Sequence, residues 1–442
     1  MKHPQPEVLE AFLDSLGVFD AGLVLHLLRC AECNSRAFNA LAPAEQRRGL
    51  LALRRDLEAV DYSTVWKRIE EASREAVAVL RRERDEAQPL LAELLRHPPE
   101  KRVEQVAKAR FHSWPLAEAL LEEGLERPAE REELARLALS IAEHLAEGEN
   151  ASRSVGDLKT AAHCEVAEAL RLQGDLKAAD AELVLAAEHL QHSIDTIERA
   201  TFCHLLAGLR KDQGRSDEAL ALLERAAALY EDLGNLAAQA AALLEMGRLN
   251  LELLDPQRAL AAFETATALG PQGLSADLAF RAIEGVALSL ALEERPEEGL
   301  QNLAFAGEHY KWPPSSYEGL ELLSLEGRLL LGTDRRDTAK KLLTTAFDGL
   351  IELGALHEAV VAGVALARAI VQARGAAGEL GLLAEKIEPL LDSPKIHPPV
   401  RAALESVLGP LRRGNVSPGL LRSLADYLER AKGNPRLELE HS

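Results

Sequence analysis

Aromatic and β-branched side chains are scarce in this sequence. Phe, Trp and Tyr together make up 4% of the 442 residues, whereas Ala, Leu, Glu and Arg dominate. Strands favour the scarce set and helices favour the abundant one, so the composition argues against a sheet-rich fold and predicts an all-α protein. A chain of this length exceeds one ordinary hydrophobic core, which indicates several domains or an open-ended repeat array.

Long apolar runs are also missing. The best candidate, from Ala359 to Val371, is short and contains Arg368, whereas a membrane-spanning helix needs about 20 apolar residues. The start of the chain, from Met1 to Val8, lacks the apolar core of a signal peptide. We therefore expect a cytoplasmic protein with no membrane partner. The chain has only four cysteines, which suits a reducing compartment and favours metal binding over a disulfide framework.

Recognisable catalytic motifs are absent too. The sequence contains no phosphate-binding G-x-x-x-x-G-K-[ST] loop, no strand-flanked G-x-G-x-x-G, no G-x-S-x-G elbow and no H-E-x-x-H pair. The many carboxylates are spread over helix faces, as solvation requires. We therefore expect a binding protein and not an enzyme.

Positive charge is in short supply over most of the chain. The formal net charge is −20, but residues 1–110 carry 18 Lys and Arg against 18 Asp and Glu, so the whole excess lies after residue 110. An acidic region of this kind is repelled by phosphate backbones and anionic lipids. The charge argues against direct nucleic-acid binding and favours a protein or peptide partner.

Internal repetition with a period of 40 residues is the most informative feature that is present. Three series of positions repeat in phase, two of small residues and one of Ala preceded three places earlier by a large apolar residue. The first series is Ala167, Ala207, Gly247, Ala287, Gly327 and Ala367; the second is Ala179, Ala219, Ala259, Gly299 and Ala339. The third is Ala186, Ala226, Ala266, Ala306 and Ala346, with Leu183, Leu223, Phe263, Leu303 and Leu343 before them.

The phasing predicts pairs of antiparallel helices. Small residues let two backbones approach closely, and the large residue fills the space beside them. Breakers separate the helices of each pair, as expected for a helix C-cap followed by a new N-terminus. These turns are Gly174-Asp175, Gly214-Arg215, Asp255-Pro256, Arg295-Pro296 and Thr333-Asp334.

The pattern resembles the tetratricopeptide repeat, most clearly from Ala240 to Leu269. The resemblance covers roughly residues 151–390 and implies a right-handed α-solenoid. The usual period is about 34 residues, and the extra length is expected in the connections between repeats, around Tyr230 to Leu236 and Ile351 to Leu356. The longer-period form looks like that of sensor and effector domains in some bacterial transcription regulators.

The resemblance also implies that the first helix of each pair lines a concave groove. Three of the implied groove positions hold glutamates, Glu168, Glu284 and Glu321. The other six hold basic side chains or histidine in an otherwise acidic region: Arg171, His204, Lys211, Arg248, Arg281 and Arg328. They favour an acidic or carboxylate-bearing peptide. The alternative is that they are solvated side chains on amphipathic helices.

The N-terminal segment contains a candidate metal site. His26-x3-Cys30-x2-Cys33 places three ligands on one helix end, and His3 is the only other His or Cys before residue 97. The inferred His2Cys2 set of His3, His26, Cys30 and Cys33 suits a closed, structural Zn²⁺ site. The alternative is a Cys pair with one His in ordinary helical core.

This stretch resembles the small zinc-binding domain of bacterial zinc-containing anti-sigma factors. The resemblance covers about the first 43 residues, with His3, His26, Cys30 and Cys33 at the matching positions. It implies a mainly structural zinc, redox-sensitive in some family members, and a sigma factor as partner. The following helix, within Leu50 to Arg84, is the implied partner surface, or else a solvated connecting helix.

The expected domain layout combines these observations. Residues 1–43 form the zinc-binding, anti-sigma-like domain, residues 44–150 a charged helical linker region, residues 151–390 the tetratricopeptide-like solenoid, and residues 391–442 capping helices and a tail. Within the linker region we expect one helix from Tyr62 to Gln88 and a new helix at Pro89. The capping helices are expected near 398–413 and 418–432.

Two functions fit this layout. In the first, the chain is a regulator whose zinc domain binds a sigma-type transcription factor while the solenoid binds a second protein or peptide. In the second, it is a scaffold that assembles an effector complex, and the zinc is purely structural. The sequence does not choose between them, and it does not give the oligomeric state.

Overall fold

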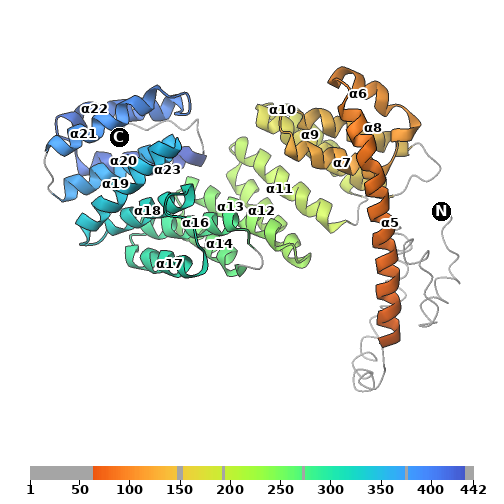
Figure 1. Cartoon of the computed structure of the whole chain (residues 1–442), viewed down its shortest axis with the longest axis horizontal. Coiled ribbons are helices and arrows are strands. Elements are labelled where there is room, and N and C mark those ends of the chain that lie inside the picture. Colours follow the sequence, from red (N-terminus) through yellow and green to blue (C-terminus); the bar gives the residue numbers. More distant parts are fainter. Residues whose placement is uncertain (1–62, 147–152, 192–194, 271–273, 374–376, 434–442) are drawn as a thin grey trace. The chain divides into compact units, whose positions relative to one another are not determined.

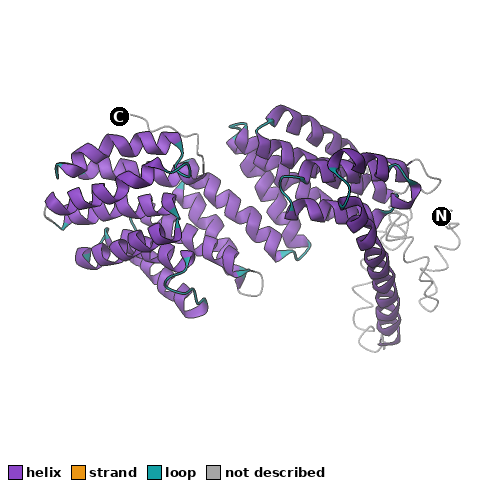
Figure 2. Cartoon of the chain, turned by 45° about the horizontal axis from the view of Figure 1, so that its top comes forward, coloured by secondary structure: helices purple, strands orange, loops and turns teal. Residues whose placement is uncertain are grey.

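The computed structural model describes residues 63–146, 153–191, 195–270, 274–373 and 377–433, and every regular element in these ranges is a helix (Figures 1 and 2). The expected all-α fold is confirmed. The zinc-binding segment, with His3, His26, Cys30 and Cys33, lies outside the described residues. The described helices divide into two compact units, which meet in the sequence at Arg215.

Unit 1 comprises the helices before Ser216. They are α5 (Ser63–Leu95), α6 (Pro99–Val106), the 3-10 turn η2 (Ala109–Phe111), α7 (Trp114–Glu126), α8 (Arg131–Ala146), α9 (Arg153–Gln173), α10 (Leu176–Leu190) and α11 (Thr196–Asp212). Consecutive helices from α7 to α10 pack as antiparallel neighbours. One core joins the end of α5 to α7, α8 and the start of α9, with Leu94, Phe111, Leu116 and Ile141 fully buried.

Helix α5 differs from the expectation for this region. It runs without interruption through Pro89, where a new helix was expected. Proline removes only the N–H that would bond the carbonyl of Asp85, and both residues are exposed, so water can serve that carbonyl. The end of α5 is anchored by Ala87, Leu91 and Leu94, which are buried.

Unit 2 begins with α12. Its helices are α12 (Ser216–Asp232), α13 (Leu236–Glu252), α14 (Pro256–Ala268), α16 (Ala276–Leu292), α17 (Pro296–His309), α18 (Tyr317–Leu330), α19 (Arg336–Leu353), α20 (Leu356–Gln372), α21 (Ala377–Ile387), the 3-10 turn η3 (Glu388–Asp392), α22 (Pro398–Arg412) and α23 (Pro418–Gly433). The pairs α13/α14, α16/α17 and α18/α19 follow the repeat, and the first helices α13, α16, α18 and α20 contact one another in order.

The small residues of the repeat lie where two helices approach a large side chain. Phe263 of α14 is fully buried, and a Cβ added at Gly247 or Gly285 would stand 2.6 or 2.5 Å from its ring. The ring therefore fits only because α13 and α16 both carry glycine there. In the pair α18/α19, a Cβ added at Gly327 would likewise stand 2.6 Å from the Leu343 side chain.

The turns inside the pairs occur where the sequence predicts them. Asp175 and Asp255 cap the following helices by accepting hydrogen bonds from the backbone N–H groups of Ala178 and Arg258, at 2.9 and 3.0 Å. The residue before each cap has a left-handed backbone, and these residues repeat at 40-residue spacing. They are Gly174, Gly214, Leu254 and Glu294, with φ of +89°, +76°, +61° and +57°.

The extra length of the repeat is distributed differently from the expectation at two places. Around Tyr230 to Leu236 it lengthens α12, which extends to Asp232, and around Ile351 to Leu356 it lengthens α19, which extends to Leu353. Tyr230 and Leu350 are buried, so the added turns of helix contribute core contacts.

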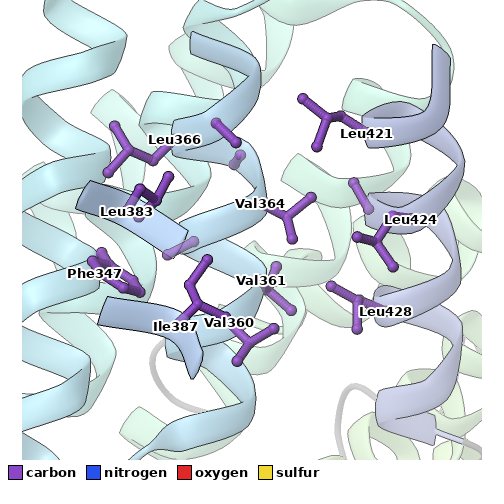
Figure 3. Close-up of a cluster of buried hydrophobic side chains, with 14 of the residues drawn as sticks. Phe347, Val360, Val361, Val364, Leu366, Leu383, Ile387, Leu421, Leu424 and Leu428 are labelled. Carbon is purple, nitrogen blue, oxygen red and sulfur yellow. The ribbon is translucent and has the colours of Figure 1, made fainter. Parts of the chain in front are cut away.

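The last helices of unit 2 pack around α20. One cluster of buried side chains includes Phe347 of α19, much of α20, and Leu383 and Ile387 of α21. Figure 3 shows Val361 and Val364 on the side of α20 that is turned toward Leu421, Leu424 and Leu428 of α23. Helix α20 is therefore covered from both sides.

No helix in the described ranges combines the length and the hydropathy required to cross a bilayer.

Candidate functional site

Helix α23 lies across the first helices of unit 2. It packs along α20 and also contacts α13, although about 165 residues separate it from α13 in the sequence. The Arg328 guanidinium of α18 is 2.7 Å from the Glu429 carboxylate of α23, and Arg422 is 3.6 Å from Glu294, in the turn after α16. Helix α23 thus touches α13, α18, α20 and the end of α16.

The two helices α20 and α23 run antiparallel. At one end, His357 Nε2 lies 3.2 Å from the backbone oxygen of Leu428. At the other end, Gln372 lines a cavity together with Pro418 and Gly419. Figure 1 shows the two helices side by side. We call the part of α18 and α20 that meets α23 the α23-binding face, and define it by Arg328, His357, Val361, Val364, Arg368 and Gln372.

The contact is mainly apolar. Leu421, Leu424 and Leu428 of α23 are buried, at 0%, 1% and 0% exposure. They recur at the three- and four-residue spacing of one helix face. Figure 3 places them against Val361 and Val364. Burying three leucines contributes on the order of 5 kcal/mol of hydrophobic free energy before entropy is subtracted.

One charge pair fixes the position of α23 on this face. Arg328 Nη1 donates to Glu429 Oε1, and the two side chains are only 15% and 20% exposed. A charge-assisted bond with this little solvent is stronger than an ordinary surface pair. The α23-binding face therefore recognises a carboxylate next to an apolar stripe.

A second cation on the face is not matched in the same way. Arg368 is half-buried and lines a cavity of about 250 Å³ with Gln372, Pro418, Gly419 and Arg422. Burial and the charge of Arg328 lower the pKa of Arg368. Within the residues that the structure describes, no carboxylate lies at ion-pair distance from it. The Asp426 carboxylate of α23 raises the pKa of Arg368 from beyond ion-pair distance, whereas Arg422 of α23 lowers it, so α23 matches this cation only in part.

The other predicted groove residues of unit 2 lie on the solvent side of their helices. Arg248 of α13 is exposed. Arg281 of α16 is half-exposed and forms a local ion pair of 3.1 Å with Asp277, one turn earlier. Of the three arginines predicted for this part of the groove, the structure brings only Arg328 to α23.

In unit 1 the predicted groove residues lie on α9 and α11. Arg171 Nε and Nη2 bond the Glu168 carboxylate at 2.7 and 2.8 Å, and Nη1 bonds Asp212. These two carboxylates raise the pKa of Arg171. His204 and Lys211 are half-buried on α11. Arg171 thus links α9 to α11, and two carboxylates of unit 1 neutralise its charge.

Unit 1 instead gathers carboxylates on its first helices. Burial raises the pKa of Glu198 to about 7, and the charges of Asp195, Asp157, Glu165 and Glu118 add to the effect. Arg131 lies 2.6 Å from Glu165 and matches that one carboxylate.

The cysteines and histidines of unit 1 are part of its packing. Cys164 and Cys203 are both buried and form no disulfide, and burial raises the pKa of Cys164 well above its ordinary value. His163 Nδ1 lies 2.7 Å from Glu182. Across the described residues, no three His, Cys, Asp or Glu side chains come together as a metal site would require.

Sequence reasoning predicted only Arg328 of the α23-binding face. It missed His357, Val361, Val364, Arg368 and Gln372, and it missed the partner carboxylate Glu429 on α23. The spacing of Leu421, Leu424 and Leu428 does signal an amphipathic helix, but nothing local in the sequence says which surface it covers. When a helix folds back over a distant helix pair, tertiary packing decides which surface it covers.

Comparisons with known proteins identify the fold. No protein-family model matches the sequence, and neither does any curated protein sequence. A signal-transduction ATPase with numerous domains and a tetratricopeptide-repeat sensor, from Pyrococcus horikoshii, is similar in structure at 15% identity and a TM-score of 0.53; 92% of this chain aligns with 54% of that one. The apo form of RapI is similar at 13% identity and a TM-score of 0.54, over 81% of this chain and 99% of that one.

At these identities the likeness shows the fold alone. The resemblance to tetratricopeptide-repeat proteins inferred from the 40-residue period is confirmed at this level.

Proposed function

We propose that this chain is a non-enzymatic protein- or peptide-binding module whose unit 2 takes an acidic, amphipathic helix. The supporting observation is the pair Arg328 and Glu429: the α23-binding face already holds an amphipathic helix by a carboxylate and three leucines. A helix laid on an apolar surface and fixed by one charge pair is a common mode of peptide recognition.

Arg368 supports a carboxylate-bearing partner. It borders the cavity at the start of α23 and has no carboxylate at ion-pair distance among the described residues. A carboxylate on an incoming helix would match this charge in a site that excludes much of the water, where a charged hydrogen bond is worth more than at the surface.

The test is binding of synthetic helical peptides to the purified full-length chain, measured by fluorescence anisotropy. The peptides share a leucine stripe at i, i+3 and i+7 and differ only in whether they carry Glu or Gln at the two positions that would face Arg328 and Arg368. We expect Glu peptides to bind better than Gln peptides, and Arg368→Ala to reduce this preference roughly tenfold.

Arg281→Ala is the matched control, because it removes a guanidinium from an exposed local pair on the same unit. Equal affinity of Glu and Gln peptides for the unaltered chain, or an equal loss in the Arg281 variant, would rule out the proposed recognition of carboxylates.

We further propose that the module belongs to a cytoplasmic regulator whose N-terminal segment binds a sigma-type transcription factor through a Zn²⁺ domain. The support is the spacing of His3, His26, Cys30 and Cys33, together with the surface of α5. In α5, Val77 and Leu80 are 45% and 40% exposed. Exposed apolar residues of this kind suit a partner-binding helix.

Elemental analysis of the untagged chain tests the zinc proposal. We expect one Zn per chain, lost in the Cys30→Ser, Cys33→Ser variant while the helical circular dichroism signal is retained. Unchanged metal content in that variant would contradict the ligand set.

Retention of a purified sigma factor by the zinc-loaded chain, and its release from the serine variant, is the expected result for a regulator. Zinc without sigma-factor binding would favour the alternative, a tetratricopeptide scaffold that assembles an effector complex around a structural metal.

A further inference from the structure

Helix α23 does not continue the stacking of the helices before it. Helix α22 packs on α21 and η3, as the next element of the array would, whereas α23 packs mainly along α20, with smaller contacts to α13 and α22. The connection between them is only residues 413–417, with Gly414 at φ +67°. Helix α23 thus does not stack as the next helix of the array but occupies the α23-binding face.

Helix α23 is held on the α23-binding face in the way that a helical peptide ligand is held. Its contacts include an apolar stripe, the charge pair between Arg328 and Glu429, a more exposed pair between Arg422 and Glu294, and a hydrogen bond from His357 to a backbone carbonyl. Several of its other side chains are exposed, including Arg422 and Ser423. A helix that binds by one stripe and a charge pair can be replaced by another helix with the same stripe and charge.

The fit of α23 is also incomplete. Its first turn borders the cavity of about 250 Å³, lined by Arg368 and Gln372. Gln372 Oε1 is buried with no hydrogen-bond partner, and Arg368 lacks a carboxylate at ion-pair distance within the described ranges. The Asp426 carboxylate of α23 acts on this cation from beyond ion-pair distance, and at the cavity itself α23 carries Arg422, which has the same charge. A better ligand would place a carboxylate there.

We propose that α23 is a built-in competitor for the proposed peptide site, displaced by a partner's amphipathic helix that carries two carboxylates, one for Arg328 and one for Arg368. This proposal rests on the proposed function of unit 2. The five-residue connection keeps α23 at a high effective concentration, so the site is closed until a helix with better charge complementarity arrives. The apparent affinity for that helix is reduced by the fraction of chains in which α23 is displaced.

The probe is a labelled peptide that copies residues 416–433 with Arg422→Glu, which supplies the second carboxylate. Its affinity is measured by fluorescence anisotropy for the unaltered full-length chain, for a Glu429→Arg variant whose own α23 is repelled by Arg328, and for a Glu405→Arg variant. Glu405 is an exposed residue of α22, so the last variant makes the same charge change away from the face.

We expect the Glu429→Arg chain to bind the probe at least about tenfold more tightly than the unaltered chain, and the Glu405→Arg chain to show no gain. A second readout uses the unaltered chain alone. Hydrogen exchange of the α23 backbone amides should accelerate when the probe is added, while that of α13 and α16 stays unchanged or slows. If Glu429→Arg lowers the helical content, Glu429→Gln replaces it, with the same expected direction.

The outcomes separate the two proposals. Equal affinity of the probe for all three chains, with no change of exchange in α23, overturns the competitor role and leaves peptide binding by unit 2 intact. Absence of binding to every chain, with unaltered circular dichroism, overturns both the competitor role and the proposed function.

Discussion

The two units are built from the same kind of helix pair. They differ in how the arginines on the first helix of a pair are neutralised. In unit 1, Arg171 bonds Glu168 on its own helix and Asp212 on the next first helix. In unit 2, Arg328 bonds Glu429, 101 residues further along the chain. The repeat therefore sets which positions carry cations, and the surrounding tertiary structure decides whether a cation is a bridge within the array or the anchor of a separate helix.

The units differ in a second way, at the turns inside the pairs. Unit 1 has Gly174 at the left-handed position, whereas unit 2 has Leu254 and Glu294. A left-handed backbone disfavours a side chain. The turn geometry is thus kept by the packing of the helix pair even where the residue opposes it.

The largest expected effect concerns the large residue of the repeat, which is Leu183 in unit 1 and Phe263 in unit 2. Phe263→Ala should destabilise unit 2 by about 3–5 kcal/mol, because the surrounding backbones of Gly247 and Gly285 cannot fill the cavity. Leu183→Ala removes a smaller side chain and should cost about 2–4 kcal/mol in unit 1. Hydrogen exchange resolved by helix measures each loss; equal losses in both units for either variant would contradict two separately folding units.

The next effect tests the acidic first helices of unit 1. Burial raises the pKa of Glu198 to about 7 in the folded chain, against about 4.5 for a free carboxyl. The folded state then binds more protons between these values, so stability falls as the pH rises from about 5 to 7. Glu198→Gln should stabilise the chain by about 1–3 kcal/mol at pH 8 and leave it unchanged at pH 4.5.

Thermal unfolding at pH 4.5 and pH 8 checks this difference. The control is Glu264→Gln on α14 of unit 2, an exposed carboxylate. A stability gain for Glu198→Gln that is the same at both pH values would mean that protonation of this carboxyl is not the cause.

A smaller effect addresses the left-handed turns. Leu254→Gly should stabilise unit 2 by about 1 kcal/mol, because glycine adopts φ +61° without the penalty of a side chain. Gly214→Leu makes the opposite change at the equivalent turn and should destabilise by a similar amount. Urea unfolding measures both; a destabilised Leu254→Gly would show that the 63% exposed Leu254 side chain contributes packing that outweighs the strain.

The last comparison, between Arg281 and Arg328, includes the smallest expected effect. Arg281→Ala removes an exposed i,i+4 pair with Asp277 and should change stability by less than about 0.5 kcal/mol. Arg328→Ala leaves Glu429 without its charge partner in a site that is 20% exposed, and should loosen α23 by about 1–3 kcal/mol. Exchange rates of the α23 amides measure the contrast, and similar rates in the two variants would contradict it.

Much of the fold could be predicted because its determinants are local. The phased small residues, the caps at Asp175 and Asp255 and the turns at 40-residue spacing each act within one helix pair. Pro89 was misread because its cost in a helix depends on whether the freed carbonyl meets water, and the sequence does not show that. The site was predicted only in part: Arg328 lies on the α23-binding face, whereas Arg171 is matched within unit 1 and Arg281 within its own helix.

The sequence by itself determined that this chain is helical, that its helices pair in 40-residue repeats, and that a row of cations lies on the first helices. These features depend on propensity, periodicity and close approach between neighbouring segments. Only the tertiary structure decided that α23 covers α20, that Glu429 meets Arg328, and that Glu198 titrates near pH 7. Each of these depends on residues brought together from distant segments, where burial and charge are set by the packed chain and not by the local pattern.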